Sequence, residues 1–516
     1  MPVTGRTLWE MLERRVDATP DRMMLVDEHG RRQTWAEFSG WVQRVAAGLA
    51  ELGIRRGDVV AWQLPTRMET IALSIALSRL SVVQSPIIHL YREREVGSLL
   101  RTTGARWFFT PGVWKGFDYD AMARSINGSF VIINGYCDLA EGDPSALPPP
   151  PDAVAGDGDE IRWLYSTSGT TSEPKVVLHT DATLIAGGTG IAIALDPQDD
   201  EIGSVTYPYA HIGGPDFLVM MLRTGLPAVL VETFSPAETY PLLRRHGVNM
   251  YGGSTAHYLA LVNHIAQTGQ HPVPTLTRMS GGGAPKPPEL YWRVKEQSGV
   301  LVHHGYGMTE CPMIANASPY DTDEQRANTD GKPVHECELL IVDEHEAPVA
   351  TGVDGNILVR GPMLAKGYLR PEQTAESFRP DGYFRTGDRG HLRPDGHIVI
   401  TGRTKELIIR KGENLSPREI EDVLMSHPTV GAIAVIGLPD ADRGERVCAV
   451  VETAPDAEPI TFQAMAQHCR DAGLMTQKIP EQLEIIEALP RNPTLKILKR
   501  ELIERFAEPT RHGDTT

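Results

Sequence analysis

Short apolar segments alternate with helix-length amphipathic segments over roughly the first 330 residues. The apolar segments are VVAWQL (59–64), WFFTPG (107–112), FVIING (130–135), GSVTYPYA (203–210), AVLVETFS (228–235), GVNMYGG (247–253) and GVLVHHGYG (299–307). Buried strands separated by helices are typical of parallel sheets, because a parallel crossover needs a long connection that then covers a sheet face. We therefore predict an α/β protein whose large N-terminal domain contains parallel-type sheets covered by helices.

The pattern changes near residue 334. From there to 404, short strand candidates such as CELLIVDEHEAP and GHIVITGR are joined by Asp-Gly and Gly-Asp turns, which favours an antiparallel β subdomain. After that the chain takes on a compact α+β pattern. We predict two domains, a large one over 1–404 and a small, mobile one over 405–516. Residues 139–159 are rich in Pro, Gly, Ala and acids and are expected to form a surface connector.

The composition excludes several classes of protein. Acidic residues outnumber basic ones 67 to 50, so the formal net charge is −17 and a broad nucleic-acid surface is not expected. The five cysteines are scattered without a CxxC pair, which indicates neither a disulfide framework nor a zinc knuckle. The first residues lack the apolar core of a signal peptide, and no run approaches the ~20 apolar residues of a membrane span. A cytoplasmic enzyme is expected.

The strongest local motif is STSGTTSEPK at 166–175, which places six Ser or Thr residues and one Gly ahead of Pro174 and Lys175. Hydroxyl groups, backbone N–H groups and one cation are the chemistry that holds a polyphosphate. The motif is not a Walker loop, because the GxxxxGK[ST] spacing is absent. Composition alone is also compatible with an ordinary Ser/Thr-rich surface turn, so the loop needs further motifs to be interpreted.

Four further motifs follow in order: YGMTE (306–310), YFRTGDRG (383–390), GRTKELIIRKGENLSPREIE (402–421) and PRNPTLKILKREL (490–502). Together the five motifs resemble those of the adenylate-forming superfamily, which comprises acyl-CoA synthetases, luciferases and the adenylation domains of peptide synthetases. The first 160 residues are compatible with this family but carry no signature. The resemblance implies that a carboxylate attacks the α-phosphate of Mg-ATP to give an acyl-adenylate and pyrophosphate. A thiol, usually that of coenzyme A, then displaces AMP.

The resemblance also implies which residues of this chain bind ATP. The expected contacts are Ser168, Gly169, Thr170, Thr171 and Lys175 with the β- and γ-phosphates; Gly282, Gly283, Ala284, Tyr306 and Gly307 with adenine; Thr309 with the α-phosphate; and Asp388 and Arg403 with the ribose. Glu310 is expected to hold Mg²⁺, a hard cation that prefers oxygen ligands. Without the family, Asp388 in TGD would be read as part of an ordinary turn, and Glu310 as a charge at a helix N-terminus.

The same resemblance assigns the chemical steps. Lys496 is expected to be the catalytic lysine, which neutralises charge as the carboxylate meets the α-phosphate. Thr309 and His211 are the other residues expected to take part in catalysis. Lys405 is expected to be the hinge, and Lys411 with Gly412 to line the passage for the pantetheine arm. A lone histidine such as His211 is also often only a packing residue.

The sequence leaves the acid and the thiol open. Small residues are expected at the wall of the acyl pocket, beside His211: Gly213, Gly214, Gly253 and Ser254. They favour an aryl, alicyclic or medium-chain acid. The acceptor stays open, since a carrier-protein thiol or an amine could take the place of coenzyme A. An inactive binding relative also stays open as the function. A homodimer stays open as the oligomeric state. Ser172, Val176 and Leu495 replace glycines that are usual in the family, which puts turnover in doubt.

Overall fold

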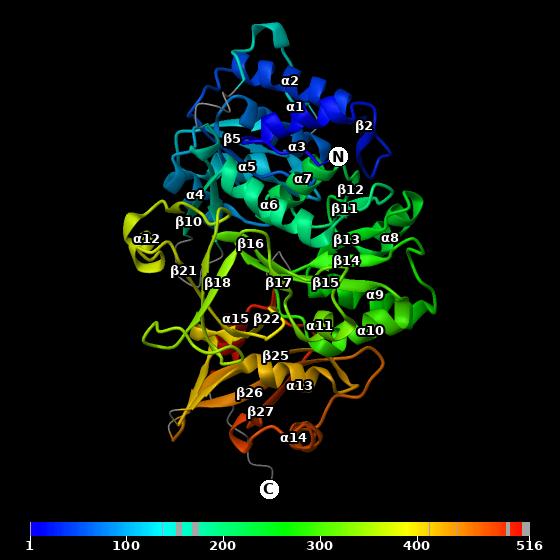
Figure 1. Ribbon diagram of the computed structural model, residues 1–516, viewed down its shortest axis with the longest axis vertical. Helices are drawn as coiled ribbons and strands as arrows, with labels where there is room; N and C mark the ends of the chain where they lie inside the picture. Colours follow the sequence, from blue (N-terminus) through cyan, green and yellow to red (C-terminus); the bar gives the residue numbers. More distant parts are fainter. Residues whose placement is uncertain are drawn as a thin grey trace.

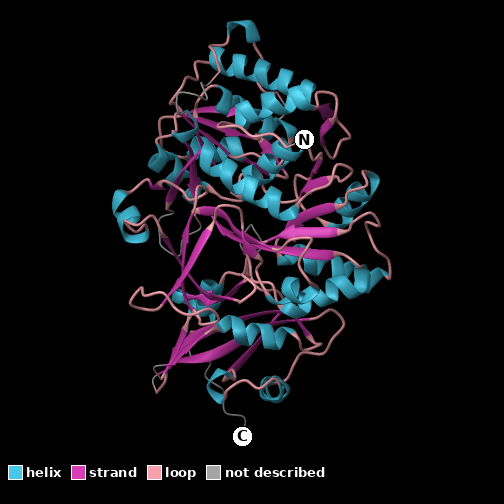
Figure 2. Cartoon of the chain, in the orientation of Figure 1, coloured by secondary structure: helices cyan, strands magenta, loops and turns pink. Residues whose placement is uncertain are grey.

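The computed structural model describes residues 2–136, 138–150, 157–167, 175–411, 413–440, 442–491 and 496–507. Figure 1 shows them as stacked layers, with α1 and α2 at one end and the strands β25, β26 and β27 at the other. Helices lie on the faces of the sheets in the N-terminal part (Figure 2). The predicted α/β class is confirmed: a large N-terminal domain of parallel sheets is followed by a C-terminal α+β domain.

The first large sheet has seven strands. Their spatial order is β20 (Gly367–Tyr368), β10 (Val176–Thr180), β9 (Ile161–Ser166), β4 (Val83–Pro86), β3 (Val59–Trp62), β5 (Trp107–Thr110) and β8 (Val131–Asn134). The strands from β9 to β8 pair in parallel, whereas β10 returns antiparallel to β9. The end of β9 and the start of β10 are therefore neighbours, and they flank the Ser/Thr-rich motif.

The second large sheet has nine strands. Their order is β17 (Lys332–Pro333), β16 (Cys311–Asn316), β15 (Leu301–Met308), β14 (Arg278–Gly281), β13 (Met250–Gly253), β11 (Gly203–Val205), β12 (Ala228–Leu230), β1 (Met23–Val26) and β2 (Arg32–Thr34). The strands from β15 to β1 pair in parallel. β16 turns back antiparallel on β15, so the YGMTE motif ends in the β15–β16 turn. Glu310 lies in this antiparallel turn and not at the start of a helix.

The main core lies between these two sheets. The helices of the N-terminal part are α1 (Leu8–Ala18), α2 (Trp35–Glu51), α3 (Met68–Arg79), α4 (Glu93–Thr103), α5 (Tyr119–Ser125), α6 (Asp181–Leu195), α7 (Gly213–Thr224), α8 (Pro236–Arg245), α9 (Thr255–Thr268), α10 (Pro288–Ser298), α11 (Asp323–Asn328) and α12 (Pro371–Ser377). Every residue of α3 is buried, and the helix packs against α1, α2 and β4. α6 and α7 pack closely since Gly188 faces Val219, and a Cβ at Gly188 would overlap that side chain.

Three smaller sheets complete the fold among the described residues, one of them the two-stranded pair of β6 (Val113–Trp114) and β7 (Phe117–Asp118). The antiparallel sheet expected after residue 334 contains β18 (Glu338–Val342), β19 (Gly355–Arg360), β21 (Phe384–Leu392) and β22 (Ile398–Arg403). The C-terminal part consists of β23 (Ile408–Arg410), β24 (Glu413–Leu415), α13 (Pro417–Met425), β25 (Val430–Asp440), β26 (Gly444–Thr453), α14 (Phe462–Asp471), β27 (Gln482–Ile486) and α15 (Lys499–Phe506). Its core of aliphatic residues on β25 and β26 is separate from the main core.

The C-terminal part rests on the N-terminal part through α13, which contacts α10 and β22. The Ser416 hydroxyl donates to the carbonyl oxygen of Thr401, and Arg418 lies beside Asp330. Both contacts cross the predicted boundary at Lys405, which belongs to a short 3-10 turn over Thr404–Glu406 and is exposed. Among the described helices, none has both the length and the apolar character needed to span a bilayer.

Candidate active site

The Asp388 side chain on β21 contacts one residue of β22 and one residue of the distant YGMTE motif. It lies on β21, directly opposite Arg403 on β22, and its side chain is only 5% exposed. The Tyr306 hydroxyl donates to Oδ2 at 2.7 Å, and Arg403 Nε donates to Oδ1 at 2.8 Å. The Asp388 amide donates to the Thr386 hydroxyl at 3.0 Å. Three residues expected to surround adenosine are thus brought together around one carboxylate.

The Lys496 ammonium lies in the electrostatic field of this cluster. Burial lowers its pKa, the Arg403 charge lowers it further, and Glu406 and Asp388 act in the opposite direction. An isolated β-bridge between Arg491 and Ile497 fixes the chain just beside Lys496. Lys499, on α15, pairs with Glu421 at 2.8 Å and with Glu406 at 3.6 Å. Lysines of the last motif therefore meet the acidic groups around the predicted hinge.

A second cluster contains Glu310. Its Oε1 accepts a hydrogen bond of 2.6 Å from the Tyr368 hydroxyl, and its carbonyl oxygen accepts one from the Ala365 amide at 2.8 Å. The Lys175 ammonium lies 4.7 Å from the centre of the Tyr368 ring, within the range of a cation–π contact. The carboxylate expected to bind metal and the lysine expected to bind phosphate therefore share one aromatic neighbour.

His211 and Thr309 line a small hollow together with Pro86, Ile88, Tyr165, Ser166, Ala210 and Ile212. Nδ1 of His211 accepts a hydrogen bond of 3.2 Å from the Gly213 amide, and burial lowers the pKa of the ring to about 4. His211 is thus a neutral imidazole at physiological pH. The Thr309 carbonyl is held at 2.7 Å by Nε2 of the buried His179.

The glycines expected at the acyl wall differ in their surroundings. A Cβ at Gly213 would lie 3.4 Å from the Tyr207 ring and 3.5 Å from His211, which is ordinary contact. A Cβ at Gly214 would overlap the Tyr209 carbonyl, and one at Gly253 would overlap the His257 ring. The Ser254 amide donates to Nδ1 of His257 at 3.1 Å. Packing therefore accounts for glycine at 214 and 253, whereas of these three positions only Gly213 accepts a Cβ without overlap.

Of the remaining predicted residues, some lie near β15, Lys411 lies in the C-terminal part, and the others fall outside the described residues. The turn at Gly282, Gly283 and Ala284 packs on β15 beside Tyr306, since a Cβ at Gly282 would overlap the Gly305 carbonyl. A Cβ at Gly307 would likewise overlap the Pro312 carbonyl. Lys411 is exposed and has a left-handed backbone, with φ of 51°. The predicted residues that lie outside the described residues are Ser168, Gly169, Thr170, Thr171 and Gly412, together with Ser172 and Leu495.

Two family models match the chain. A family model described as AMP-binding enzyme matches residues 12–369, and one described as AMP-binding enzyme C-terminal domain matches 419–496. The chain belongs to the AMP-binding enzyme family. It is therefore a ligase of the adenylate-forming superfamily, as the five motifs predict.

Relatives within the AMP-binding enzyme family use different acceptors. The chain is 32% identical to a 2-succinylbenzoate–CoA ligase of Geobacillus kaustophilus, over 96% of this chain and 97% of the relative. It is 31% identical to a salicyl-AMP ligase/salicyl-S-ArCP synthetase of Mycobacterium tuberculosis, over 98% and 92%. The ATP-bound structure of MatB from Rhodopseudomonas palustris superposes with a TM-score of 0.86 at 26% identity, covering 98% of this chain and 99% of MatB.

The structure adds residues that the motifs did not indicate. Tyr368 lies in AKGYLR, outside the five motifs, and only the short strand β20 brings it to Glu310 and Lys175. His179 fixes the Thr309 carbonyl and could not be found without knowing the pairing, whereas Thr386 lies within YFRTGDRG and fixes the amide of Asp388 two residues later. Val176 is a buried residue of β10 paired with Ser166, so this position is extended and needs no glycine.

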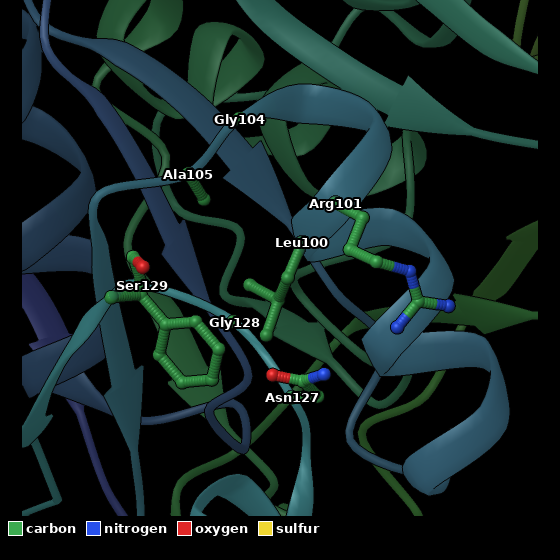
Figure 3. Close-up of a pocket in the computed structure, with 8 residues that line it drawn as sticks. Leu100, Arg101, Gly104, Ala105, Asn127, Gly128 and Ser129 are labelled. Carbon is green, nitrogen blue, oxygen red and sulfur yellow. The ribbon is translucent and has the colours of Figure 1, made fainter.

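A separate hollow has none of the predicted site residues in its lining (Figure 3). It is lined by Leu100, Arg101, Gly104, Ala105, Asn127, Gly128, Ser129 and Phe130, at the end of α4 and before β8. In Figure 3 the Arg101 side chain extends away from Gly104 and Ala105 along the helix. Because none of the site residues lines it, this hollow plays no part in the function proposed below.

Proposed function

We propose that this protein activates a carboxylic acid with ATP and transfers the acyl group to the thiol of coenzyme A. The observation that carries the proposal is the cluster at Asp388. One buried carboxylate accepts from Tyr306 and Arg403 while the Lys496 ammonium lies in the same field. Such a cluster suits the joining of two anions, because fixed positive charge must face the forming bond between carboxylate and α-phosphate.

The nucleoside would bind around Asp388. Each carboxylate oxygen has two acceptor sites, and Tyr306 and Arg403 use one on each oxygen. The ribose hydroxyls can donate to the remaining sites, and charge-assisted hydrogen bonds of this kind are strong. The Tyr306 ring, beside the turn at Gly282–Ala284, offers a face for adenine.

The phosphates would extend toward Glu310 and Lys175. Among the described residues, no group of three or more His, Cys, Asp or Glu side chains is placed to hold a metal ion. Mg²⁺ in nucleotide sites needs no such group, since it uses one or two carboxylates together with phosphate oxygens and water. Glu310 fits that role and would hold Mg²⁺, which supplies charge neutralisation at the phosphates. Lys175, just before β10, adds a second positive charge.

The chemistry then proceeds in two steps. A carboxylate oxygen of the acid attacks the α-phosphorus, and the bond to the bridging oxygen breaks, which releases pyrophosphate. The thiolate sulfur of coenzyme A next attacks the acyl carbon, and AMP leaves with the electron pair of the acyl–oxygen bond. In the first step Lys496 contributes charge and position and transfers no proton. His211, neutral and lining the same hollow as Thr309, would lie between the acid and the entering thiol.

An aryl, alicyclic or medium-chain acid fits the acyl side best. The hollow at His211 is walled by the small Ala210 and Ser166 and by the rings of Tyr165 and His211. Gly213 leaves space beside Tyr207. A carrier-protein thiol is the second acceptor to consider, because a relative that matches over the whole chain is named a salicyl-S-ArCP synthetase.

The test separates the two half-reactions. Pyrophosphate release is measured with ATP and a panel of acetate, octanoate, cyclohexanecarboxylate and benzoate. We expect acid-dependent release with at least one ring or medium-chain acid. The activated acid is then offered coenzyme A, a phosphopantetheinylated carrier protein or an amine. Capture by coenzyme A supports the proposal. Capture by the carrier or the amine alone supports the second acceptor class, and absence of acid-dependent pyrophosphate release contradicts adenylation itself.

A further inference from the structure

The segment over residues 365–369 ties Glu310 to the strand that follows the Ser/Thr-rich motif. The Ala365 amide donates to the carbonyl oxygen of Glu310 at 2.8 Å. The segment then forms β20, which pairs antiparallel with β10. The amides of Lys366 and Leu369 donate to carbonyl oxygens of β10 at 2.9 and 2.8 Å. The segment is therefore fixed both to the β15–β16 turn and to β10.

Within this segment Tyr368 is held in one orientation. It is 5% exposed, and its amide donates to the Thr374 hydroxyl at 2.8 Å. Its ring meets that of Phe378 edge to face, with centroids 5.9 Å apart and an interplanar angle of 81°. Gly367 has φ of 134°, and a Cβ there would lie 2.8 Å from the Thr374 hydroxyl, so this close approach requires glycine. Backbone and ring contacts together leave the Tyr368 side chain little freedom.

From this position Tyr368 contacts two charged groups with different parts of its side chain. The hydroxyl donates to Oε1 of Glu310 at 2.6 Å, and the Lys175 ammonium lies 4.7 Å from the centre of the ring. The first contact is a charge-assisted hydrogen bond, and the second is an attraction between a cation and the ring face. Among the ion pairs that join described residues, none links Lys175 with Glu310. The cation and the carboxylate thus share a neighbour without neutralising one another.

A second tyrosine of the chain shows the alternative arrangement. The Tyr383 hydroxyl donates to Oε2 of Glu338 at 3.3 Å, and the Arg360 guanidinium lies 4.6 Å from the centre of the Tyr383 ring. Here the cation and the carboxylate also pair directly, at 2.5 Å. A cation and a carboxylate that contact one tyrosine can therefore neutralise one another, and at Tyr368 they are kept from doing so.

We propose that Tyr368 is a positioning residue of the ATP site: its hydroxyl orients the Glu310 carboxylate for Mg²⁺, and its ring keeps the Lys175 ammonium available for the phosphates. This inference rests on the adenylation proposed above and adds a residue to it. The hydroxyl occupies Oε1 of Glu310 and leaves Oε2 for a metal ion. Groups that orient a metal ligand in this way typically contribute about 10–100-fold to metal affinity.

The experiment measures binding and needs no turnover. ATP is titrated calorimetrically into the protein without any acid, once with excess Mg²⁺ and once with EDTA. The ratio of the two affinities is the gain that the metal provides. Tyr368→Phe keeps the ring and removes the hydroxyl, so this gain is expected to fall about tenfold or more, while the ATP affinity in EDTA stays unchanged. A purely structural role of the hydroxyl would lower both affinities alike.

Two further variants test the ring and provide the control. Tyr368→Leu keeps an apolar side chain against Phe378 but removes the ring face, so Lys175 can pair with Glu310. Its ATP affinity is expected to fall about threefold or more even in EDTA, because the phosphates lose a cation. Tyr383→Phe is the matched control, since it removes a hydroxyl with the same kinds of partner, and it should change neither affinity.

The outcomes distinguish this inference from the proposed function. An equal metal-dependent gain in wild type and in Tyr368→Phe would overturn the inference and leave adenylation standing. So would a loss of the same size in Mg²⁺ and in EDTA. Absence of ATP binding to the wild-type protein under both conditions would overturn the proposed function, and this inference with it. Thermal unfolding checks that each variant folds, and if Tyr368→Leu does not, Tyr368→Phe decides.

Discussion

Arg418 on α13 and Asp330, just after α11, form an ion pair of 3.6 Å across the predicted boundary between the two domains. The Asp330 side chain is 6% exposed. Burial by itself would raise the pKa of this carboxyl, but Arg418, His304, the Ile400 amide and Lys286 together hold it below its usual range. With the C-terminal part in this position, the charges of Arg403 and Asp388 act on the pKa of Lys496. The ion pair therefore stabilises the arrangement that suits adenylation.

The first prediction concerns that ion pair. Arg418→Met leaves the Asp330 carboxylate buried without its arginine partner. Breaking a buried ion pair in this way typically costs about 3–5 kcal/mol of stability. We expect the C-terminal part to leave its docked position more often, so that pyrophosphate formation slows more than thioester formation from supplied acyl-adenylate. Stopped-flow measurement of the two steps checks this. Arg443→Met, which removes an arginine paired with Asp440 within the C-terminal part, is the control and should slow neither step selectively.

The second prediction tests the ribose contact. Asp388→Ala removes the acceptor of Tyr306 and Arg403 and should weaken ATP binding by about 2–4 kcal/mol, because charge-assisted hydrogen bonds are lost. Isothermal titration with ATP measures the change. Asp354→Ala provides the comparison, since Asp354 also contacts β21 and β22, through Arg389 and Thr401, but is half-exposed. Equal ATP affinity in wild type and Asp388→Ala would remove the assignment.

The third prediction uses the difference between two adjacent glycines. Gly213→Leu has space at its Cβ and should fold, while penalising bulky acids by about 1–3 kcal/mol and sparing acetate and propionate. Gly214→Ala, which places a methyl group against the Tyr209 carbonyl, should lower stability for every substrate. Acid panels and thermal unfolding of both variants provide the measurement. A uniform loss of activity in Gly213→Leu would move the acyl pocket elsewhere.

The sequence predicted those features that depend on local pattern. The alternation of apolar segments gave the parallel sheets because each strand and helix is specified by its own residues. The family resemblance of the motifs likewise singled out Tyr306, Asp388 and Arg403, since each lies within one short motif. The pairs that hold the site could not be predicted in this way. Tyr368 with Glu310 and Arg418 with Asp330 are 58 and 88 positions apart, and only sheet order and docking bring them together.

The fourth prediction concerns pH. Burial raises the pKa of Asp422 on α13 from 3.8 to about 6. The charges of Glu421 and Asp330 also raise this pKa, whereas those of Arg418 and Lys286 lower it. The folded protein therefore binds this proton more tightly than the unfolded chain, and the contribution to stability falls as pH rises from about 4 to about 6. The side chain introduced in Asp422→Asn cannot ionise. The urea concentration at the unfolding midpoint of this variant, compared with that of wild type, should therefore increase between pH 4.5 and pH 7.

A carboxylate shifted the other way provides the control for this prediction. Burial acts to raise the pKa of Asp395, but hydrogen bonds from Gln325 and His397 lower this pKa to about 2. Its contribution is present above the unfolded pKa and is lost only as pH falls through about 2. Asp395→Asn should therefore lower the midpoint by the same amount at pH 4.5 and pH 7. An Asp422→Asn difference that is also constant over this range would contradict the assignment.

The last prediction addresses how one small domain serves two reactions. Lys496 and Gly412 both follow Lys405 but are expected to act in different steps, one on the attacking carboxylate and one on the entering thiol. Rotation about an exposed hinge at Lys405 resolves this conflict. Lys496→Ala should cut pyrophosphate formation by several orders of magnitude, because a charge aimed at the transition state is gone, and should largely spare thioester formation from supplied acyl-adenylate. Gly412→Leu should do the reverse, and Lys405→Pro should impair the second step more. If Lys496→Ala and Gly412→Leu damage both steps alike, one fixed arrangement must serve both reactions, and the docking through Arg418 and Asp330 is then permanent.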